Sequence, residues 1–326
     1  MVEASELVKR LMLDGFSINE IQEKMHLTNR QLSAILKDIR DHGFNTTRIY
    51  SSDGTIIHKL NNNLNLNPYT TTRINVKDKF LRAIFLSDLH IGSIYERPEL
   101  LKIVAEYAKK HNIHIIFNCG DLIDNVYPNS NQVLKNPTVA SQVQKVLRIY
   151  PADPSITHFI LYGNHDAKSL LEDGFDIARY IESKRYDMVS LGYGIANVHL
   201  KDDMITIAHD LKRRKQPPID QRSSITFKGH SHKSKNSFKE AKIIYVAALS
   251  EDETGTYEYR PLPSFLDVDF QFYDKKIERV NIKQLSIVNG QIRLSNEEAI
   301  ILNPELAQKK AQAKRLQKQI KPNWQK

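Results

Sequence analysis

Four short clusters of carboxylate, amide and imidazole side chains carry the residue types that could do chemistry in this sequence. They read SDLHIG at residues 87–92, NCGDLIDN at 118–125, YGNHD at 162–166 and GHSH at 229–232, and a separate histidine, His209, follows another apolar run. A single cluster of this kind is typical of an ordinary turn, because glycine, asparagine and aspartate are common turn residues. Several of them in one chain instead favour a shared metal site.

Each cluster comes directly after an apolar run that predicts a buried strand. The runs are Leu81–Leu86, Ile113–Phe117, Ile156–Leu161, Met204–Ala208 and Ile225–Lys228. Open α/β sheets place their ligand sites beyond the ends of their strands. The positions of the clusters therefore predict a ligand site at the strand ends.

The order of these motifs, D-x-H, G-D-x-x-D, G-N-H-D, H and G-H-x-H, resembles the calcineurin-like metallophosphoesterases over roughly residues 80–275. The resemblance implies an α/β (α+β) fold, a β-sandwich flanked by helices, with two divalent metal ions at the strand ends. The ligands that it implies are Asp88, His90 and His232 for one ion, Asn164, His209 and His230 for the other, and Asp121 as the bridge between them. It also implies that His165 protonates the leaving oxygen or stabilises the transition state, and that Asp124 orients His165.

The chemistry of this ligand set is consistent with the resemblance. Oxygen and imidazole donors without a thiolate suit Mn, Fe, Zn or Ni, of which Mn²⁺ is the first choice here. Two such ions can lower the pKa of a shared water and clamp phosphoryl oxygens. The expected activity is therefore metal-dependent hydrolysis of a phosphate ester.

Two positions depart from the family's protein phosphatases, which carry arginine just after the second aspartate and just before G-N-H. Here these positions hold Asn125 and Tyr162. Without a guanidinium to bind a dianionic phosphomonoester through two hydrogen bonds, the sequence favours a phosphodiester in nucleic acid or a nucleotide. The alternatives are a small-molecule phosphomonoesterase, or a DNA-binding regulator that uses the phosphoesterase domain as a metal-dependent sensor or scaffold.

Residues 1–60 predict a separate small domain. A helix is expected over Ala4–Asp14, and capping boxes at Ser17–Glu20 and Thr28–Gln31 predict two more helices joined by a tight turn. The Asp53-Gly54 turn predicts a hairpin. Together these elements resemble a winged helix-turn-helix domain.

The charge of this domain does not decide its partner. Residues 1–50 contain seven basic and seven acidic side chains, and a neutral surface is a weak footprint for phosphates. Arg30, Gln31 and Ser33 are candidates for reading bases. A protein-contact or dimerisation role on the same scaffold is an equal alternative.

An asparagine-rich linker is predicted over residues 61–78, the phosphoesterase domain over 79–302 and a basic tail or helix over 303–326. The net charge is +9. Seven cations and no acid lie after Leu306, so the preceding body carries only 9 − 7 = +2. The tail is therefore a second candidate for contact with DNA or RNA, unless it is simply solvated.

The remaining features concern the setting of the chain. No apolar stretch approaches the roughly 20 residues of a membrane helix, no signal-peptide pattern opens the sequence, and one cysteine, Cys119, permits no internal disulfide. We therefore expect a cytoplasmic protein without membrane contact, of unknown oligomeric state. The run Lys212–Lys215 is either a solvated loop or a site for a polyanionic substrate. Helices are expected at Pro98–Lys110 and within Thr138–Tyr150.

Overall fold

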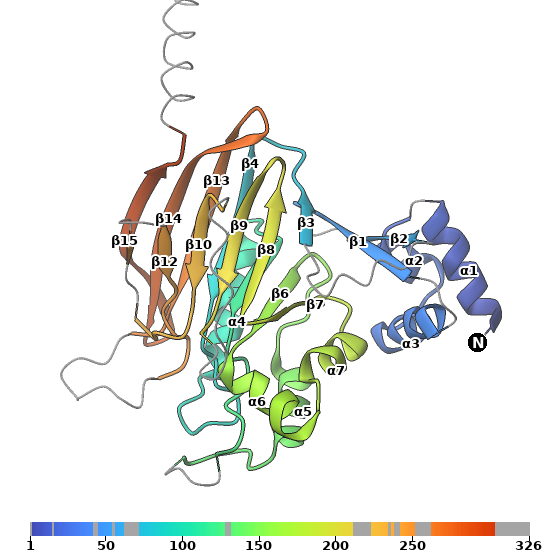
Figure 1. The fold of residues 1–326 in the computed structure, drawn as a ribbon, viewed down its shortest axis with the longest axis horizontal. Helices are drawn as coiled ribbons and strands as arrows, with labels where there is room; N and C mark the ends of the chain where they lie inside the picture. Colours follow the sequence, from blue (N-terminus) through green and yellow to red (C-terminus); the bar gives the residue numbers. More distant parts are fainter. Residues whose placement is uncertain are drawn as a thin grey trace, which may run out of the picture.

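The computed structural model describes most of the chain (Figure 1). The described residues are 2–14, 16–41, 45–53, 56–61, 72–127, 132–210, 223–233, 236–237, 242–251 and 262–303. Parts of four predicted features lie outside them: Gly54 of the hairpin turn, residues 62–71 of the linker, the run Lys212–Lys215, and the tail from Pro304 onward.

One sheet has seven strands in the order β15-β14-β13-β4-β5-β6-β7. Their bounds are β4 Phe80–Leu86, β5 Ile115–Cys119, β6 Thr157–Tyr162, β7 Met188–Tyr193, β13 Ser264–Tyr273, β14 Lys276–Val288 and β15 Gln291–Ile301. Strands β4 to β7 pair in parallel, whereas β13 joins β4 antiparallel and begins an antiparallel meander. The parallel half thus brings the ends of β4, β5 and β6 to one edge of the sheet.

The second sheet has eight strands in the order β11-β12-β10-β9-β8-β3-β1-β2. Their bounds are β1 Asn45–Ser51, β2 Ile56–Asn61, β3 Thr72–Asn75, β8 Ile195–Leu200, β9 Asp203–Ala208, β10 Ile225–Lys228, β11 Asn236–Ser237 and β12 Ile243–Tyr245. Strands β9 and β10 pair in parallel, so their ends also lie side by side.

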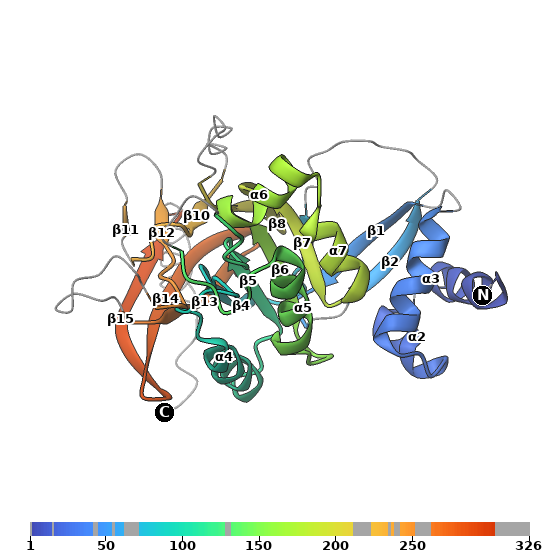
Figure 2. The same cartoon turned by 90° about the horizontal axis from the view of Figure 1, so that it is seen from below.

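The two sheets pack face to face around an aromatic core. The ring centroid of Phe85 on β4 lies 3.8 Å from that of Phe227 on β10 and 4.8 Å from that of Phe117 on β5. Alternation along β4 sends Ala83 and Phe85 into this core and Ile84 into a second core. That second core lies under helices α4 Pro98–Lys110, α5 Val139–Ile149 and α7 Ile177–Lys184, and α6 Asn164–Asp173 lies next to α7 (Figures 1 and 2). The predicted sandwich with flanking helices is confirmed.

Several local predictions are confirmed as well. Helix α4 spans Pro98–Lys110 as expected, with proline in its first turn. Helix α5 begins after Thr138, whose hydroxyl accepts the N–H of Ser141. Asn289 and Gly290, both at positive φ, connect β14 to β15, as an Asn-Gly pair favours.

The N-terminal part has the three helices and the hairpin expected from the sequence: α1 Val2–Leu13, α2 Ile18–Lys24, α3 Asn29–Asp41 and the β1–β2 pair. Both capping boxes form, at Ser17 with Glu20 and at Thr28 with Gln31. Assignment of this unit as a winged helix-turn-helix remains a prediction.

The N-terminal unit is joined to the body more closely than the sequence indicates. Strand β1 pairs in parallel with β3, which occupies residues 72–75 of the predicted linker. The buried side chains of α3, such as Leu32 and Ile39, belong to the same contiguous core as the sandwich. Helix α3 also lies against α7 (Figure 2).

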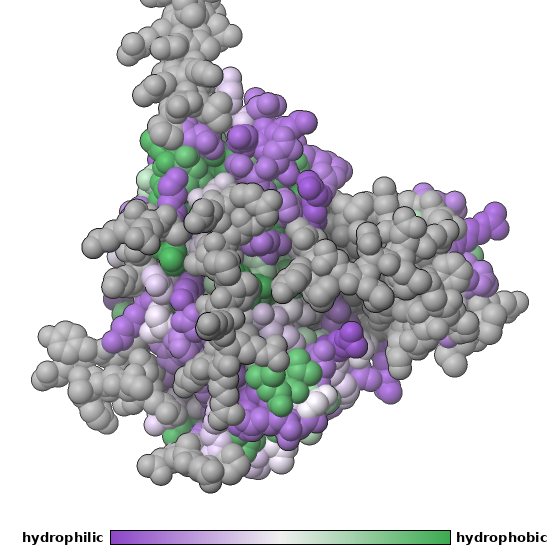
Figure 3. All heavy atoms as spheres, in the orientation of Figure 1, coloured by the Kyte–Doolittle hydropathy of each residue, from purple (hydrophilic) through white to green (hydrophobic). Residues whose placement is uncertain are grey.

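Among the described residues seen in Figure 3 polar side chains predominate, and hydrophobic ones gather in the region of α6 and α7. Leu171 and Phe175 are exposed there. Within the described residues, no helix combines the length and apolar character that crossing a membrane requires.

Candidate metal centre

The proposed ligands lie in loops that directly follow the ends of strands from both sheets. Asp88 and His90 follow β4, Asp121 follows β5, and Asn164 opens α6 after β6. His209 follows β9, and His230 and His232 follow β10. The centre therefore lies where the strand ends of the two sheets meet.

The backbone at these positions is unusual. Five of the proposed ligands have positive φ: Asp88 (53°), His90 (43°), Asp121 (53°), His230 (75°) and His232 (55°). Left-handed backbone costs energy for residues other than glycine and persists only where surrounding structure enforces it. Its concentration here indicates that the loops are shaped to aim these side chains.

One group of donor atoms forms around Asp88. Nε2 of His232 lies 3.3 Å from Oδ1 of Asp88 and 3.2 Å from Nε2 of His90. Nε2 of His90 is 3.9 Å from the same carboxylate oxygen. Oδ2 of Asp88 accepts the backbone N–H of His230, so Oδ1 is the oxygen directed at the group.

A second group forms around Asp121, with ring nitrogens of His209 and His230. Oδ2 of Asp121 is 3.0 Å from Nε2 of His209 and 3.9 Å from Nε2 of His90. Because His90 belongs to the first group, Asp121 lies between the two. Its other oxygen, Oδ1, accepts the backbone N–H of His165.

Hydrogen bonds fix which nitrogen each central imidazole presents. Nδ1 of His209 is 2.7 Å from the backbone oxygen of Cys119, and Nδ1 of His90 is 2.9 Å from Oδ1 of Asp124. Both partners only accept, so each Nδ1 carries the proton and each Nε2 offers its lone pair to the centre. Outer partners of this kind orient metal-binding histidines.

A metal ion fits this set of residues. Oδ1 of Asn164 is buried and has no hydrogen-bond partner among the described residues, which leaves an amide oxygen free to bind a cation. Carboxylate, amide and imidazole donors suit divalent Mn, Fe, Zn or Ni. Asp88, His90 and His232 would hold one ion, and Asn164, His209 and His230 the other, with Asp121 between them.

Two glycines make the close packing possible. A Cβ at Gly120 would lie 2.2 Å from Nδ1 of His209, and φ there is +113°. A Cβ at Gly163 would lie 2.2 Å from Oδ1 of Asp121. The glycines of the G-D and G-N-H motifs therefore leave room for the ligands of neighbouring strands.

His165 lies beside the two groups, with a fifth of its side chain exposed. Its Nδ1 is 2.7 Å from the backbone oxygen of Asp124 and 3.5 Å from the Asp124 carboxylate. The sequence predicts that Asp124 orients His165; Asp124 contacts both His165 and His90, and its carboxylate is closer to His90. A ring nitrogen of His165 also lies near donor atoms of His90 and Asp121.

Charges in the centre shift the pKa values of Asp121 and His165. Burial favours the neutral form of Asp121, but His209 and His165 outweigh it and hold the pKa of this carboxyl far below its usual range. Burial likewise lowers the pKa of His165, but the charge of Asp121 and the hydrogen bonds to Asp124 raise it to about 9. The carboxylates thus favour the protonated form of His165.

Asp166 is a positioning residue that sequence reasoning left without a role. Its buried carboxylate accepts the backbone N–H groups of Leu122, Ile123 and Gly163. It thereby joins the loop after Asp121 to the start of α6. An acid directly after G-N-H, three residues after Gly163, was the available signal, because this spacing is typical of a helix start.

The two positions that lack arginine are closed to substrate. Asn125 is buried, and its amide donates to the backbone oxygen of His165. Tyr162 is buried against Tyr193, with ring centroids 5.4 Å apart. Neither side chain brings a cation to the centre.

The sequence model of the calcineurin-like phosphoesterase family matches residues 81–275, more than half of the chain. The chain belongs to this family. Its members work with two divalent metal ions, and the protein is accordingly a metal-dependent phosphoester hydrolase. The family match and the ligand set do not identify the metal.

Solved structures with a similar fold include three that differ widely in sequence. The anchor in the inner membrane complex of Plasmodium has 10% identity and a TM-score of 0.42, covering 69% of this chain and 89% of its own. The calcineurin-like phosphoesterase YfkN from Bacillus subtilis has 8% identity and a TM-score of 0.34, with 72% and 99% covered. The Pseudomonas putida nuclease MPE has 12% identity and a TM-score of 0.33, with 65% and 86% covered. No curated protein matches the sequence.

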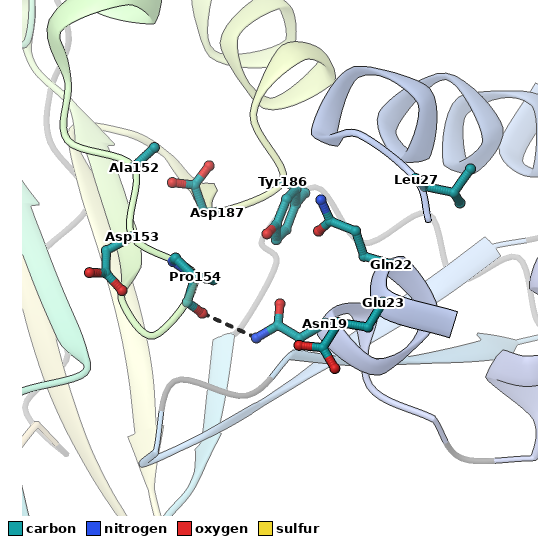
Figure 4. Close-up of a pocket in the computed structure, with 9 residues that line it drawn as sticks. All are labelled: Asn19, Gln22, Glu23, Leu27, Ala152, Asp153, Pro154, Tyr186 and Asp187. Atoms are coloured by element: carbon teal, nitrogen blue, oxygen red, sulfur yellow. Dashed lines mark hydrogen bonds between the residues drawn. The ribbon is translucent and has the colours of Figure 1, made fainter. Parts of the chain in front are cut away.

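A pocket of about 390 Å³ lies at the junction of the N-terminal unit and the phosphoesterase body, apart from the metal centre (Figure 4). Its lining includes Gln22 and Glu23 of α2, and Tyr186 and Asp187 of the body. Asn19 donates a hydrogen bond across the junction to the backbone oxygen of Pro154. None of the proposed metal ligands lines this pocket.

Proposed function

We propose that the protein is a dinuclear phosphodiesterase that acts on nucleic acid or on a nucleotide. The observation that supports a diester is the burial of Asn125 and Tyr162, the two neutral residues at the arginine positions of protein phosphatases. A phosphomonoester dianion would lack its two-pronged guanidinium partner there. A phosphodiester carries one negative charge less than a phosphomonoester dianion, so its binding depends less on a guanidinium group.

In this proposal the side chains divide into ligands and a proton donor. Bound metal ions would supply Lewis-acid activation of water and charge stabilisation at the phosphoryl group. His165 would protonate the leaving oxygen. Its Nδ1 donates to the carbonyl oxygen of Asp124, so Nε2 is the nitrogen that can transfer a proton. Manganese is the first choice of metal, with Fe, Zn or Ni as alternatives.

Contact with DNA or RNA is proposed through the N-terminal unit or the basic tail. Arg30 is exposed on α3 and can meet phosphate or base. The side-chain oxygen of Gln31 instead accepts from the N–H and hydroxyl of Thr28, which reduces its capacity to read a base. Because these hydrogen bonds occupy Gln31, they favour an enzyme over the alternative of a DNA-binding regulator. Cytoplasmic location stays at the level of prediction.

The experiment is a substrate panel with the metal-loaded full chain. We expect turnover of a generic aryl phosphodiester and of single-stranded or double-stranded DNA or RNA, with much weaker turnover of the matching aryl monoester. Preparations in Mn²⁺, Fe²⁺, Zn²⁺ and Ni²⁺ should be compared under the same conditions. A strong preference for the monoester would contradict the diester proposal.

A further inference from the structure

One face of α6 continues outward from the metal centre on the side of His165. His165, Lys168 and Glu172 follow each other at three- and four-residue spacing on this helix, which places them along one face. Lys168 forms an ion pair with Glu172. The face therefore runs from the proposed proton donor to a cation and then to an exposed carboxylate.

Tyr127 connects the first two of these residues through its ring. The rings of Tyr127 and His165 meet edge to face with centroids 5.1 Å apart. Nζ of Lys168 lies 5.3 Å from the centroid of the Tyr127 ring, within the range of a cation–π contact. Tyr127 thus contacts both the His165 ring and the ammonium group of Lys168.

The location of this cation is significant because the leaving group must depart past His165, which protonates it. Lys228, a cation on the other side of the centre beside His230, lies 2.8 Å from a carboxylate oxygen of Asp210. Lys168 is paired as well, and the two carboxylates are about equally exposed, Asp210 with 39% and Glu172 with 40% of the side chain. Lys168 differs from Lys228 in that its ammonium group lies over the Tyr127 ring, which contacts His165. Exposed ion pairs contribute little, so an incoming phosphate can replace Glu172.

We propose that Lys168 and Tyr127 form a subsite for the leaving group and that the subsite binds a further phosphate on it. This inference rests on the proposed phosphodiesterase function. The corresponding substrate is an oligonucleotide, in which the leaving nucleoside carries the next phosphate of the strand. Lys168 supplies a point charge for that phosphate, and Tyr127 holds the charge at a fixed distance from His165.

The test compares three dithymidine diesters: one with no further phosphate, one with a 3′-phosphate and one with a 5′-phosphate. Analysis of the products identifies which nucleoside leaves. Lys168→Gln should raise KM about tenfold for the diester whose leaving nucleoside is phosphorylated, because a charge-assisted contact is lost. For the unphosphorylated diester KM should stay within about twofold of wild type, because this substrate has no further phosphate for Lys168 to bind.

Glu172→Gln should change KM in the direction opposite to Lys168→Gln. It removes the competitor for Lys168, so KM for the same phosphorylated diester should fall, by about two- to threefold. Lys168→Arg should keep the preference because it keeps the charge. The matched control is Lys184→Gln on α7, since Nζ of Lys184 also lies over a tyrosine ring, 5.5 Å from the centroid of Tyr180, but outside the centre; this variant should behave as wild type.

The outcomes separate the two proposals. If wild type hydrolyses the diesters but Lys168→Gln changes KM equally for all three, or Lys168→Gln and Glu172→Gln change KM in the same direction, the subsite is refuted and the phosphodiesterase survives. If wild type hydrolyses none of the three diesters or of the generic substrates, the proposed function fails and the subsite fails with it.

Discussion

Asp121 and His165 are close neighbours that we expect to contribute in different ways. Oδ2 of Asp121 faces His90 and His209, one from each donor group. His165 contacts Asp121 through its backbone N–H and presents its ring beside the groups. A carboxylate can bind two cations at once, whereas a protonated imidazole can donate a proton to the departing oxygen.

Substitution at these two residues should therefore have separable effects. Asp121→Asn should lower both the metal content and the rate, because it removes the charge between the two sites. His165→Ala should leave about two ions bound per chain and slow turnover by roughly 10²–10⁴-fold, the usual contribution of general acid–base catalysis. Metal analysis of the purified variants beside steady-state kinetics measures both effects. An equal fall in metal content in both variants would assign His165 to the ligands.

A second residue-scale prediction concerns His158, which is buried on β6 with both ring nitrogens lacking a hydrogen-bond partner among the described residues. Burial lowers its pKa to about 4. The unfolded chain binds a proton near pH 6.5, so between roughly pH 6.5 and 4 only the unfolded state gains the proton. Stability should thus fall as pH falls through this window, by on the order of 3 kcal/mol.

Urea unfolding of the metal-free chain between pH 4 and 7 would measure this loss. His158→Phe removes the titrating group and should flatten the part of the pH dependence that His158 causes. An unchanged slope in this variant would show that other groups, such as the carboxylates of the centre, account for the acid sensitivity.

At the scale of elements, the strand-end loops determine the geometry of the centre. Gly120, at φ +113°, would place a Cβ against the His209 ring, whereas Gly192, at φ +85°, has open space around the same position. Both glycines use backbone that disfavours side chains. Only at Gly120 does a proposed ligand occupy the space.

Gly120→Ala should therefore displace His209 and reduce metal binding, in addition to a strain cost of roughly 1–3 kcal/mol. Gly192→Ala should show the strain cost alone. Metal titration and thermal unfolding of both variants distinguish the two effects. Full metal binding in Gly120→Ala would mean that the His209 loop can move aside without loss.

The same loops explain what could be predicted from the sequence. The apolar runs before the motifs were sufficient to predict that Asp88 and Asp121 meet, because the parallel strands β4 and β5 bring their ends together. His230 follows β10 of the other sheet, and its place beside them was predicted only from the motif order that carries the family resemblance. The path of each loop was not predictable. As a result the three N–H groups on Asp166, and the closer approach of the Asp124 carboxylate to His90, emerge only in three dimensions.

At the scale of the whole molecule, the N-terminal unit and the sandwich form a connected structure. Strand β1 extends the eight-stranded sheet through β3, and Asn19 donates to the backbone of Pro154 across the junction. The sequence predicts the helices and the hairpin from local caps and turns. It does not reveal the β1–β3 pairing, because the paired residues Tyr50 and Ile74 are far apart in the sequence and no local cap or turn predicts their contact.

Net charge provides the last prediction, which concerns where nucleic-acid affinity resides. The first 50 residues are neutral and the body carries only +2, whereas seven cations follow Leu306. If all seven contact duplex phosphates, the logarithm of affinity should fall with the logarithm of salt concentration with a slope near −6, from about −0.9 per neutralised phosphate. Fluorescence titrations of a labelled duplex at several salt concentrations give this slope.

Truncation after Leu306 should then flatten the salt dependence and weaken binding to all sequences alike. Hydrolysis of a small diester should survive, because no proposed ligand lies beyond His232. The full chain with Lys309, Lys310, Lys314 and Arg315 changed to glutamine is the matched control for length, and it should lose about four of the seven charge contacts. Retention of both affinity and slope by the truncated protein would instead assign the contact to Arg30 of α3 or to the Lys212–Lys215 run, since those cations remain.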